Sequence, residues 1–170
     1  VNLVTGDSGS TGASLGGGSF GTVRGSGMVS GQRYLLFADA FRTAGNFEWF
    51  DDRSTIFIVD DDRFMRRHNN DKPQGSVLGR VDSGDEKLAL TLLNSFVSRA
   101  GGVPGFTFAP TERVRYGLTR DLLVASAEGT TGSVRLTGRG YGMLRHETLD
   151  DRRGEIGVGR TESVDRSRSV

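Results

Sequence analysis

The sequence predicts a mainly β protein, with an antiparallel β-sandwich or jelly-roll-like core and one amphipathic α-helix packed on it. Short apolar and aromatic segments alternate with polar residues between turn residues, as in antiparallel sheets. Only one segment, residues 84–100, has apolar residues at helical spacing. A chain of 170 residues is long enough to form one domain. We divide it into residues 1–31, a Gly/Ser-rich extended arm or set of weak edge strands, residues 32–160, a single mainly β domain, and residues 161–170, a polar tail.

The composition excludes several classes of function. The formal net charge is +1, so no overall field attracts nucleic acid, which we do not expect as a partner. The absence of cysteine excludes disulfides, thiolate catalysis and cysteine-ligated zinc. No apolar run reaches the roughly 18 residues of a transmembrane helix, so we expect no membrane span. The chain opens on Val1, as expected of a processed start or of a segment of a longer product.

Residues 1–31 are dominated by Gly, Ser and Thr, with scattered apolar side chains. Such a stretch gains little from burial, because it has few large apolar groups to remove from water. We therefore expect it either to lie extended along another surface or to remain mobile.

Three segments after this arm are predicted as strands or loops. Residues 31–43 have apolar groups at both alternating positions, which is typical of a strand covered on both faces. Residues 46–50 and 53–62 are predicted as further strands, the second of which ends in an acidic turn. Residues 63–75 are polar and are predicted to form a long exposed loop.

A helix is predicted over residues 84–100. Ser83 and Glu86 match the S-x-x-E capping box, and Gly101 and Gly102 follow as a stop signal. The apolar stripe between them consists of Leu88, Ala89, Leu92, Leu93, Phe96, Val97 and Ala100. We expect this stripe to pack on a sheet, with partner binding as the alternative.

Short alternating segments follow the predicted helix and indicate half-buried antiparallel strands. In one of them Gly138, Gly140 and Gly142 recur at every second position, which leaves one strand face without side chains. Because a bare face allows close approach of another backbone, these glycines are candidates for a subunit contact. A tight bend of the sheet is the alternative.

Two short motifs do not carry the chemistry that they resemble. Residues 14–25 match the G-x-G-x-x-G-x-V loop of protein kinases, but the chain has only two lysines and neither an H-R-D nor a D-F-G segment. The GDSGS of residues 6–10 resembles the nucleophile segment of chymotrypsin-like proteases, which place their His and Asp upstream of it. We therefore expect a turn or a strand edge at residues 14–25, no catalytic triad at Ser8, and no cofactor.

No catalytic residues are assigned, because no acid, base and nucleophile converge in the sequence. His146 and Glu147 are adjacent and form the strongest candidate pair for hydrolase or nuclease chemistry, since imidazole and carboxylate are common general acids and bases. The acidic residues 60–62 lack the ligand spacing of an EF-hand calcium loop. Charge solvation at a turn is their expected role, and no metal site is assigned.

Residues 47–52 are the candidate ligand-binding segment. Phe47 and Trp49 share one face of a short predicted strand, and Asp51 and Asp52 follow. If the rings project outward, they form a stacking platform for a sugar ring. Packing in the core is the alternative for Trp49.

These observations favour a non-enzymatic structural or assembly subunit of a virion, appendage or surface layer. Its partners would be further copies of the same chain, contacted through the N-terminal arm and the glycine-rich strands, in a virion or outside the cell. A carbohydrate- or ligand-binding β-sandwich is the first alternative. A hydrolase or nuclease that uses His146 and Glu147 is the second.

Overall fold

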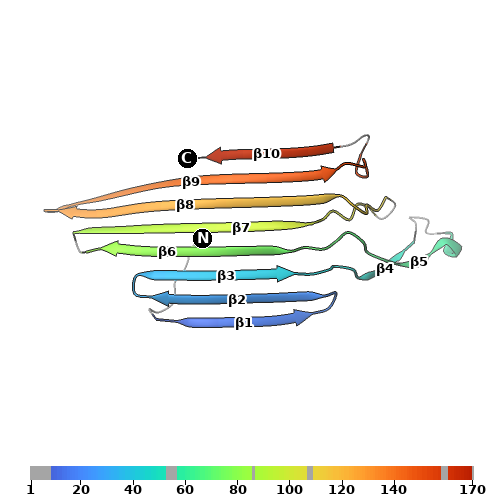
Figure 1. Ribbon diagram of the computed structural model, residues 1–170, viewed down its shortest axis with the longest axis horizontal. Coiled ribbons are helices and arrows are strands. Elements are labelled where there is room, and N and C mark those ends of the chain that lie inside the picture. Colours follow the sequence, from blue (N-terminus) through green and yellow to red (C-terminus); the bar gives the residue numbers. More distant parts are fainter. Residues whose placement is uncertain (1–8, 53–56, 86, 107–108, 158–160, 170) are drawn as a thin grey trace.

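The computed structural model describes residues 9–52, 57–85, 87–106, 109–157 and 161–169. It confirms a mainly β, antiparallel protein. Eight strands form one sheet in the order β1-β2-β3-β6-β7-β8-β9-β10, and β4 pairs with β5 in a separate hairpin (Figure 1). The bounds are Thr11–Gly18 (β1), Thr22–Gly31 (β2), Tyr34–Arg42 (β3), Glu48–Asp51 (β4), Arg63–Arg66 (β5), Gln74–Gly84 (β6), Leu88–Gly102 (β7), Arg115–Thr131 (β8), Val134–Asp151 (β9) and Thr161–Ser169 (β10), with a 3-10 turn, η1, at Val59–Asp61.

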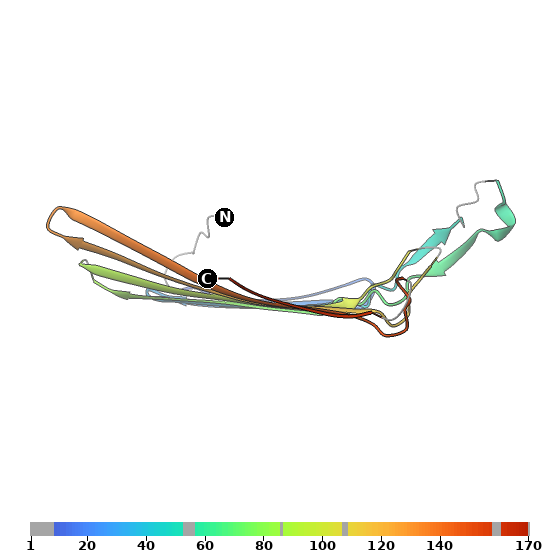
Figure 2. The same ribbon diagram turned by 90° about the horizontal axis from the view of Figure 1, so that it is seen from above.

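The large sheet is a single layer. Seen along its edge it is a thin, gently curved ribbon, and the β4–β5 hairpin projects from one end (Figure 2). Among the described residues no second sheet packs on either face, so the predicted sandwich or jelly roll is not confirmed. Alternation of apolar and polar residues distinguishes the two faces of a strand, but it does not specify which element covers each face.

The prediction of a helix over residues 84–100 is wrong, because Gly84 ends β6 and residues 88–100 belong to β7. Glu86, expected in the capping box, lies outside the described residues. The expected stripe is split between the two faces of the strand, with Leu92 and Phe96 on one side and Leu93 and Val97 on the other. β7 pairs with β6 along one edge and with β8 along the other. These long-range hydrogen bonds override the local helical spacing, as tertiary context commonly does.

The segments expected to be an arm and a tail contribute strands to the sheet. β1 and β2 fall within residues 1–31, of which residues 1–8 lie outside the described part. β10 occupies most of residues 161–170. β1 and β10 are the two edge strands.

The other predicted strands and loops agree with the structure in part. β3 corresponds to the strand predicted at residues 31–43, and β4 to that at residues 46–50. The expected cover on both faces of the first strand is wrong, since Tyr34 and Leu36 are 50% and 48% exposed. No strand is seen in the described part of residues 53–62, which contains η1, while residues 53–56 lie outside the described part. The loop predicted at residues 63–75 contains β5, which pairs with β4, and the first two residues of β6.

The connections differ at the two ends of the sheet. Tight turns join β2 to β3, β6 to β7 and β8 to β9 at one end (Figure 1). The connections from β3 to β6, from β7 to β8 and from β9 to β10 lie at the other end and are longer. Among the described residues, no helix has the length and apolar character that crossing a membrane requires.

The most deeply buried side chains lie beside the longer connections. Val114 and Thr111, in the connection before β8, are each 1% exposed. Among the described residues, Val114 is the one hydrophobic side chain that is fully buried. The strands of the sheet therefore lack a buried hydrophobic core of their own.

Candidate interaction surface

The strand register assigns each strand residue to one of two faces, because directly paired residues point to the same side. Directly paired residues form a row across the sheet. The row through Leu92 of β7 contains Val81 and Tyr34 on one side and Ala125 and Gly140 on the other. We call the face that carries this row the aliphatic face. The opposite face, which carries the neighbouring residue of each strand, is called the charged face.

Exposed hydrophobic side chains are concentrated on the aliphatic face. Of the large hydrophobic side chains exposed on the described sheet strands, fifteen lie on this face and two, Tyr116 and Tyr141, on the charged face. The fifteen are Leu15, Val23, Tyr34, Leu36, Val77, Val81, Leu88, Leu90, Leu92, Phe96, Leu123, Val134, Leu136, Leu144 and Val164. Contiguous apolar patches of this extent are rare on free monomers and mark interaction sites.

The three glycines proposed for a subunit contact lie on the aliphatic face of β9. A Cβ atom built on Gly138, Gly140 or Gly142 meets no heavy atom within 4 Å. Gly138 and Gly140 line a shallow hollow of about 610 Å³, together with Leu90 and Leu92. The bare strand face is thus open to a neighbour.

Four ion pairs join side chains of the described sheet strands, and all four lie on the charged face. They are Arg24–Asp39, Arg80–Asp82, Arg135–Glu128 and Arg145–Glu147. Arg24 Nε lies 2.9 Å from Asp39 Oδ2, and the Asp39 side chain is only 8% exposed. This face is therefore organised by charge pairing, in contrast to the aliphatic face.

Glu147 is the centre of one network on the charged face. It accepts hydrogen bonds from Arg145 and from the Tyr116 hydroxyl, the latter at 3.0 Å. These two hydrogen bonds, that of Arg145 above all, hold the pKa of the Glu147 carboxyl below its ordinary value. Burial raises the pKa of Tyr116, and the hydrogen bond to Glu147 raises it further.

His146 and Glu147 are not brought together. His146 pairs in register with Thr119 and Arg166 on the aliphatic face, whereas Glu147 lies on the charged face. Successive side chains of a strand point to opposite sides of the sheet. The two groups therefore cannot act on one substrate atom from these positions.

A polar corner interrupts the aliphatic face near β10. His146, Arg166 and Arg168 line a shallow hollow there together with Asp121. Asn94 donates a hydrogen bond of 2.7 Å to Asp121 Oδ1. In β8 and β9, the charged and imidazole side chains of the aliphatic face thus begin beyond Leu123 and Leu144, respectively.

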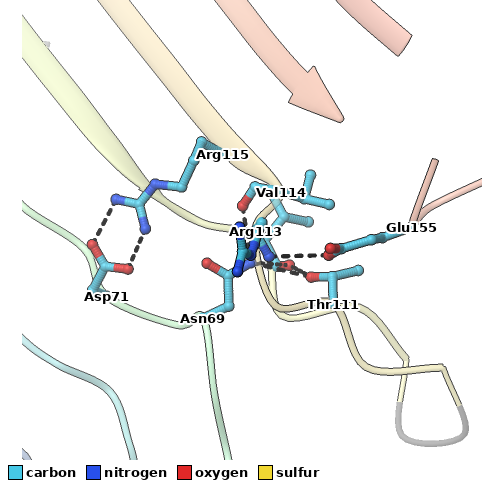
Figure 3. Close-up of polar contacts among 8 residues, drawn as sticks. Asn69, Asp71, Thr111, Arg113, Val114, Arg115 and Glu155 are labelled. Carbon is cyan, nitrogen blue, oxygen red and sulfur yellow. Dashed lines mark hydrogen bonds and ion pairs between the residues drawn. The ribbon is translucent and has the colours of Figure 1, made fainter. Parts of the chain in front are cut away.

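The longer connections are joined by a polar clamp (Figure 3). Asn69 Nδ2 donates to the carbonyl oxygens of Val103 and Val114, at 3.1 and 2.9 Å, and to Thr111 Oγ1 at 3.2 Å. Glu155 Oε2 accepts from two backbone N–H groups of the same connection at 2.7 and 3.0 Å. These bonds satisfy backbone groups in the best-buried part of the protein.

The residues of the candidate sugar platform are placed around the β4–β5 hairpin. The Phe47 ring contacts Phe20 edge to face at 6.0 Å. Trp49 is half-buried and pairs in register with Met65. Asp51 is 5% exposed and therefore buried.

The aspartates considered for calcium form part of a 3-10 turn. Residues 60 and 61 lie in η1, and the Asp62 N–H donates to the Val59 carbonyl at 3.2 Å. Across the described residues, no cluster of three or more His, Asp or Glu side chains has the geometry to hold a metal ion.

Comparison with known proteins assigns no family. No family model matches the chain, and no characterised protein or solved structure matches it significantly. The function is therefore inferred from the faces and edges of the sheet.

Sequence reasoning missed most of the aliphatic face and all of the polar clamp. The alternation of Leu88, Leu90 and Leu92 was a usable signal, since these residues are spaced by two. The clamp had no such signal, because Asn69 meets Thr111 across 42 positions of sequence.

Proposed function

We propose that the chain is a non-enzymatic assembly subunit that extends its open sheet by pairing its edge strands with those of further copies. The observation that carries this proposal is an eight-stranded sheet with one strand free at each end and no closed hydrophobic interior in the described residues. Unpaired strand edges are templates for pairing with another chain.

The edge strand β1 lacks the features that protect edges from pairing. Residues 11–18 contain no proline and no charged side chain, and all eight residues are exposed. Natural edge strands that avoid pairing are commonly charged, bulged or covered. β1 is therefore suited to receive another strand.

The strand directions favour pairing of β10 with β1 of the next copy. Each strand of the sheet is antiparallel to its neighbour, and the number of strands is eight. β1 and β10 consequently run in opposite directions, so copies related by a translation continue the antiparallel pattern. Such head-to-tail contacts generate rings or filaments.

Cysteine cross-linking tests the edge pairing on a background without native cysteine. Ala13→Cys in β1 is combined in turn with Glu162→Cys, Val164→Cys and Arg166→Cys in β10, all on the aliphatic face. We expect one of the three combinations to form an intermolecular disulfide selectively, because only one brings the side chains opposite each other.

Leu90→Cys in the central strand β7 is the matched control, since it is exposed on the same face but has no free edge. It should not cross-link to Ala13→Cys. Equal cross-linking of the control, or a monomer by light scattering with no selective disulfide, would contradict the proposal.

Ligand binding by the β4–β5 hairpin is a second candidate function, favoured by a different pair of rings. Phe50 and Phe64 are directly paired, lie edge to face at 5.4 Å, and are 54% and 76% exposed. Exposed aromatic faces are suited to stacking on a sugar ring. Binding to a glycan array should be lost for Phe64→Ala. It should be kept for the control Val59→Ala, since Val59 is 73% exposed and carries no ring. A parent chain that binds no glycan on the array would contradict this function.

A further inference from the structure

We propose that the aliphatic face lies against the acyl chains of a lipid bilayer, with its strands crossing the hydrocarbon at a slant. This proposal goes beyond the edge pairing proposed above and identifies what covers the face that edge pairing leaves open. In hydrocarbon, the backbone N–H and C=O groups of β1 and of residues 134–141 of β9, which the described part of β10 does not reach, require further strands as partners.

The aliphatic face is free of charged side chains over a continuous band. The band spans six neighbouring strands, and its stretches are residues 23–31, 34–40, 75–83, 88–100, 123–131 and 134–144. Within them, no residue that faces this side is Asp, Glu, Lys, Arg or His. The same stretches carry charges such as Arg24, Arg80 and Arg139 on the charged face. Contact with hydrocarbon requires this segregation.

Four of the six stretches have the length of strands that cross hydrocarbon. The stretch in β3 spans seven residues and that in β7 thirteen. Those in β2, β6 and β8 each span nine residues, and that in β9 spans eleven. A transmembrane β-strand needs about 9–11 residues when it is tilted. At about 3.3 Å per residue and a tilt of about 40°, these stretches cover roughly 23 to 28 Å, close to the apolar band of about 25 Å that such strands present.

The border of the band at the tight turns runs obliquely across the strands. It lies at Gly31 in β2, and the register row from Gly31 reaches β9 at Gly140. In β9 the band begins at Val134, which lies six residues from Gly140, or about 20 Å along the strand. The row crosses five strand spacings, about 24 Å. The border is therefore inclined by about 40° to the direction that runs across the sheet at right angles to its strands.

A flat hydrocarbon slab explains this slope. Strands that cross a bilayer tilt by about 35–45°, so a border parallel to the membrane must shift from strand to strand by this amount. A second sheet stacked on the face would impose no such relation. The slope therefore favours lipid over a second copy as the occupant.

The side chains at the ends of β3 fit such a border. On the aliphatic face this strand begins with Tyr34 and ends with Arg42, with Leu36, Ala38 and Ala40 between them. Tyrosine favours the interface between hydrocarbon and water, and a long arginine side chain reaches out to it. The absence of a long apolar run in the sequence is compatible with lipid contact, because alternate residues of a strand face the other side.

Quenching by lipid tests this contact on two neighbouring residues of β9. Gly140→Cys and Tyr141→Cys are exposed at the middle of the same stretch but lie on the aliphatic and charged faces, respectively. Each is labelled with bimane in the full chain and mixed with vesicles of phosphatidylcholine that carry bromine on the acyl chains. We expect the fluorescence at Gly140→Cys to be lost and that at Tyr141→Cys to be retained.

A second pair of variants reports binding without a label. Leu92→Arg places a charge in the centre of the band, whereas Leu93→Arg places it on the charged face. Flotation with phosphatidylcholine vesicles should be lost for Leu92→Arg and kept for Leu93→Arg. Loss in both variants, or retention in both, would overturn the lipid contact.

The cross-linking between β1 and β10 is measured in the same vesicle samples, which separates the two proposals. Selective cross-linking with no quenching at Gly140→Cys overturns the lipid contact and leaves the assembly proposal in place. Quenching with no cross-link supports the lipid contact and contradicts pairing between copies. Excimer emission from pyrene at Gly140→Cys, without quenching, would show a second copy on this face and overturn the lipid contact.

Discussion

Arg115 and Asp71 form a bidentate ion pair, with Nη1–Oδ1 and Nη2–Oδ2 distances of 2.6 and 2.8 Å (Figure 3). Arg115 begins β8, and Asp71 lies in the connection that leads to β6. The pair therefore joins two of the longer connections at one end of the sheet. Planar pairing of this kind fixes the orientation of both side chains as well as their distance.

The Arg115–Asp71 pair should make stability depend on pH. Its hydrogen bond to Arg115 lowers the pKa of Asp71 in the folded protein. A carboxyl group whose pKa is lowered by folding stabilises the folded state at pH values above its pKa in the unfolded chain. This contribution is lost as the pH falls through the pKa of the folded state. Both side chains are more than a third exposed, so we expect at most about 1 kcal/mol.

A double-mutant cycle of Asp71→Asn and Arg115→Gln, followed by urea unfolding, measures this coupling. It should be present at neutral pH and vanish in strong acid, where Asp71 is protonated. A coupling energy that is unchanged by acid would contradict the assigned interaction.

Asn69 should be required both for its amide and for its backbone conformation. It donates to three oxygen atoms and has a φ of 51°, a left-handed conformation that Asn tolerates better than Ala. Asn69→Ala should lower the free energy of unfolding by about 1–3 kcal/mol through the unsatisfied groups, with a further cost of about 1 kcal/mol from the backbone.

Asn69→Gly separates these two contributions, because glycine adopts positive φ without strain. Urea unfolding should place it between the parent chain and Asn69→Ala. Equal free energies of unfolding for Asn69→Ala and Asn69→Gly would assign the whole loss to the missing amide and would contradict a contribution from the backbone conformation.

The pKa of Tyr116 should lie above that of an ordinary tyrosine, because burial and the hydrogen bond to Glu147 both raise it. Glu147→Gln removes the negative charge that disfavours the phenolate, so the pKa of Tyr116 should fall toward its ordinary value. Ultraviolet absorbance of phenolate during an alkaline titration measures this shift. Tyr116→Phe identifies the signal among the three tyrosines, and an unshifted curve in Glu147→Gln would count against the network.

Gly84 should tolerate alanine poorly at the turn between β6 and β7. Its φ is 111°, and a Cβ built there clashes with the Leu88 carbonyl oxygen. Gly84→Ala should therefore destabilise the protein by about 1–3 kcal/mol through backbone strain, and by more where the clash is not relieved.

Gly132→Ala is the matched control in the turn between β8 and β9. Gly132 has a φ of 61° but nothing within 4 Å of a built Cβ. Its substitution should cost only the left-handed conformation, about 1 kcal/mol. Thermal unfolding should rank the parent chain above Gly132→Ala and Gly132→Ala above Gly84→Ala; the reverse order of the two variants would contradict the close approach at Gly84.

The sequence by itself determined the class of secondary structure over most of the chain. Alternating side chains and frequent turn residues indicate antiparallel strands, and apolar groups at both alternating positions predict a strand at residues 31–43. The bare face at Gly138, Gly140 and Gly142 was also readable, because it depends only on spacing along one strand. Local periodicity suffices for such features.

Only the tertiary structure decided the state of residues 84–100, the number of layers and the relation of the two faces. Leu92 and Leu93 fit a helical stripe as well as a strand, and pairing with β6 and β8 selects the strand. The aliphatic face exists only once six strands are aligned, since each contributes a few alternate residues. Asn69 meets Val114 across 45 positions. Pairing and clamping of this kind join segments that are distant in sequence, and no local pattern encodes them.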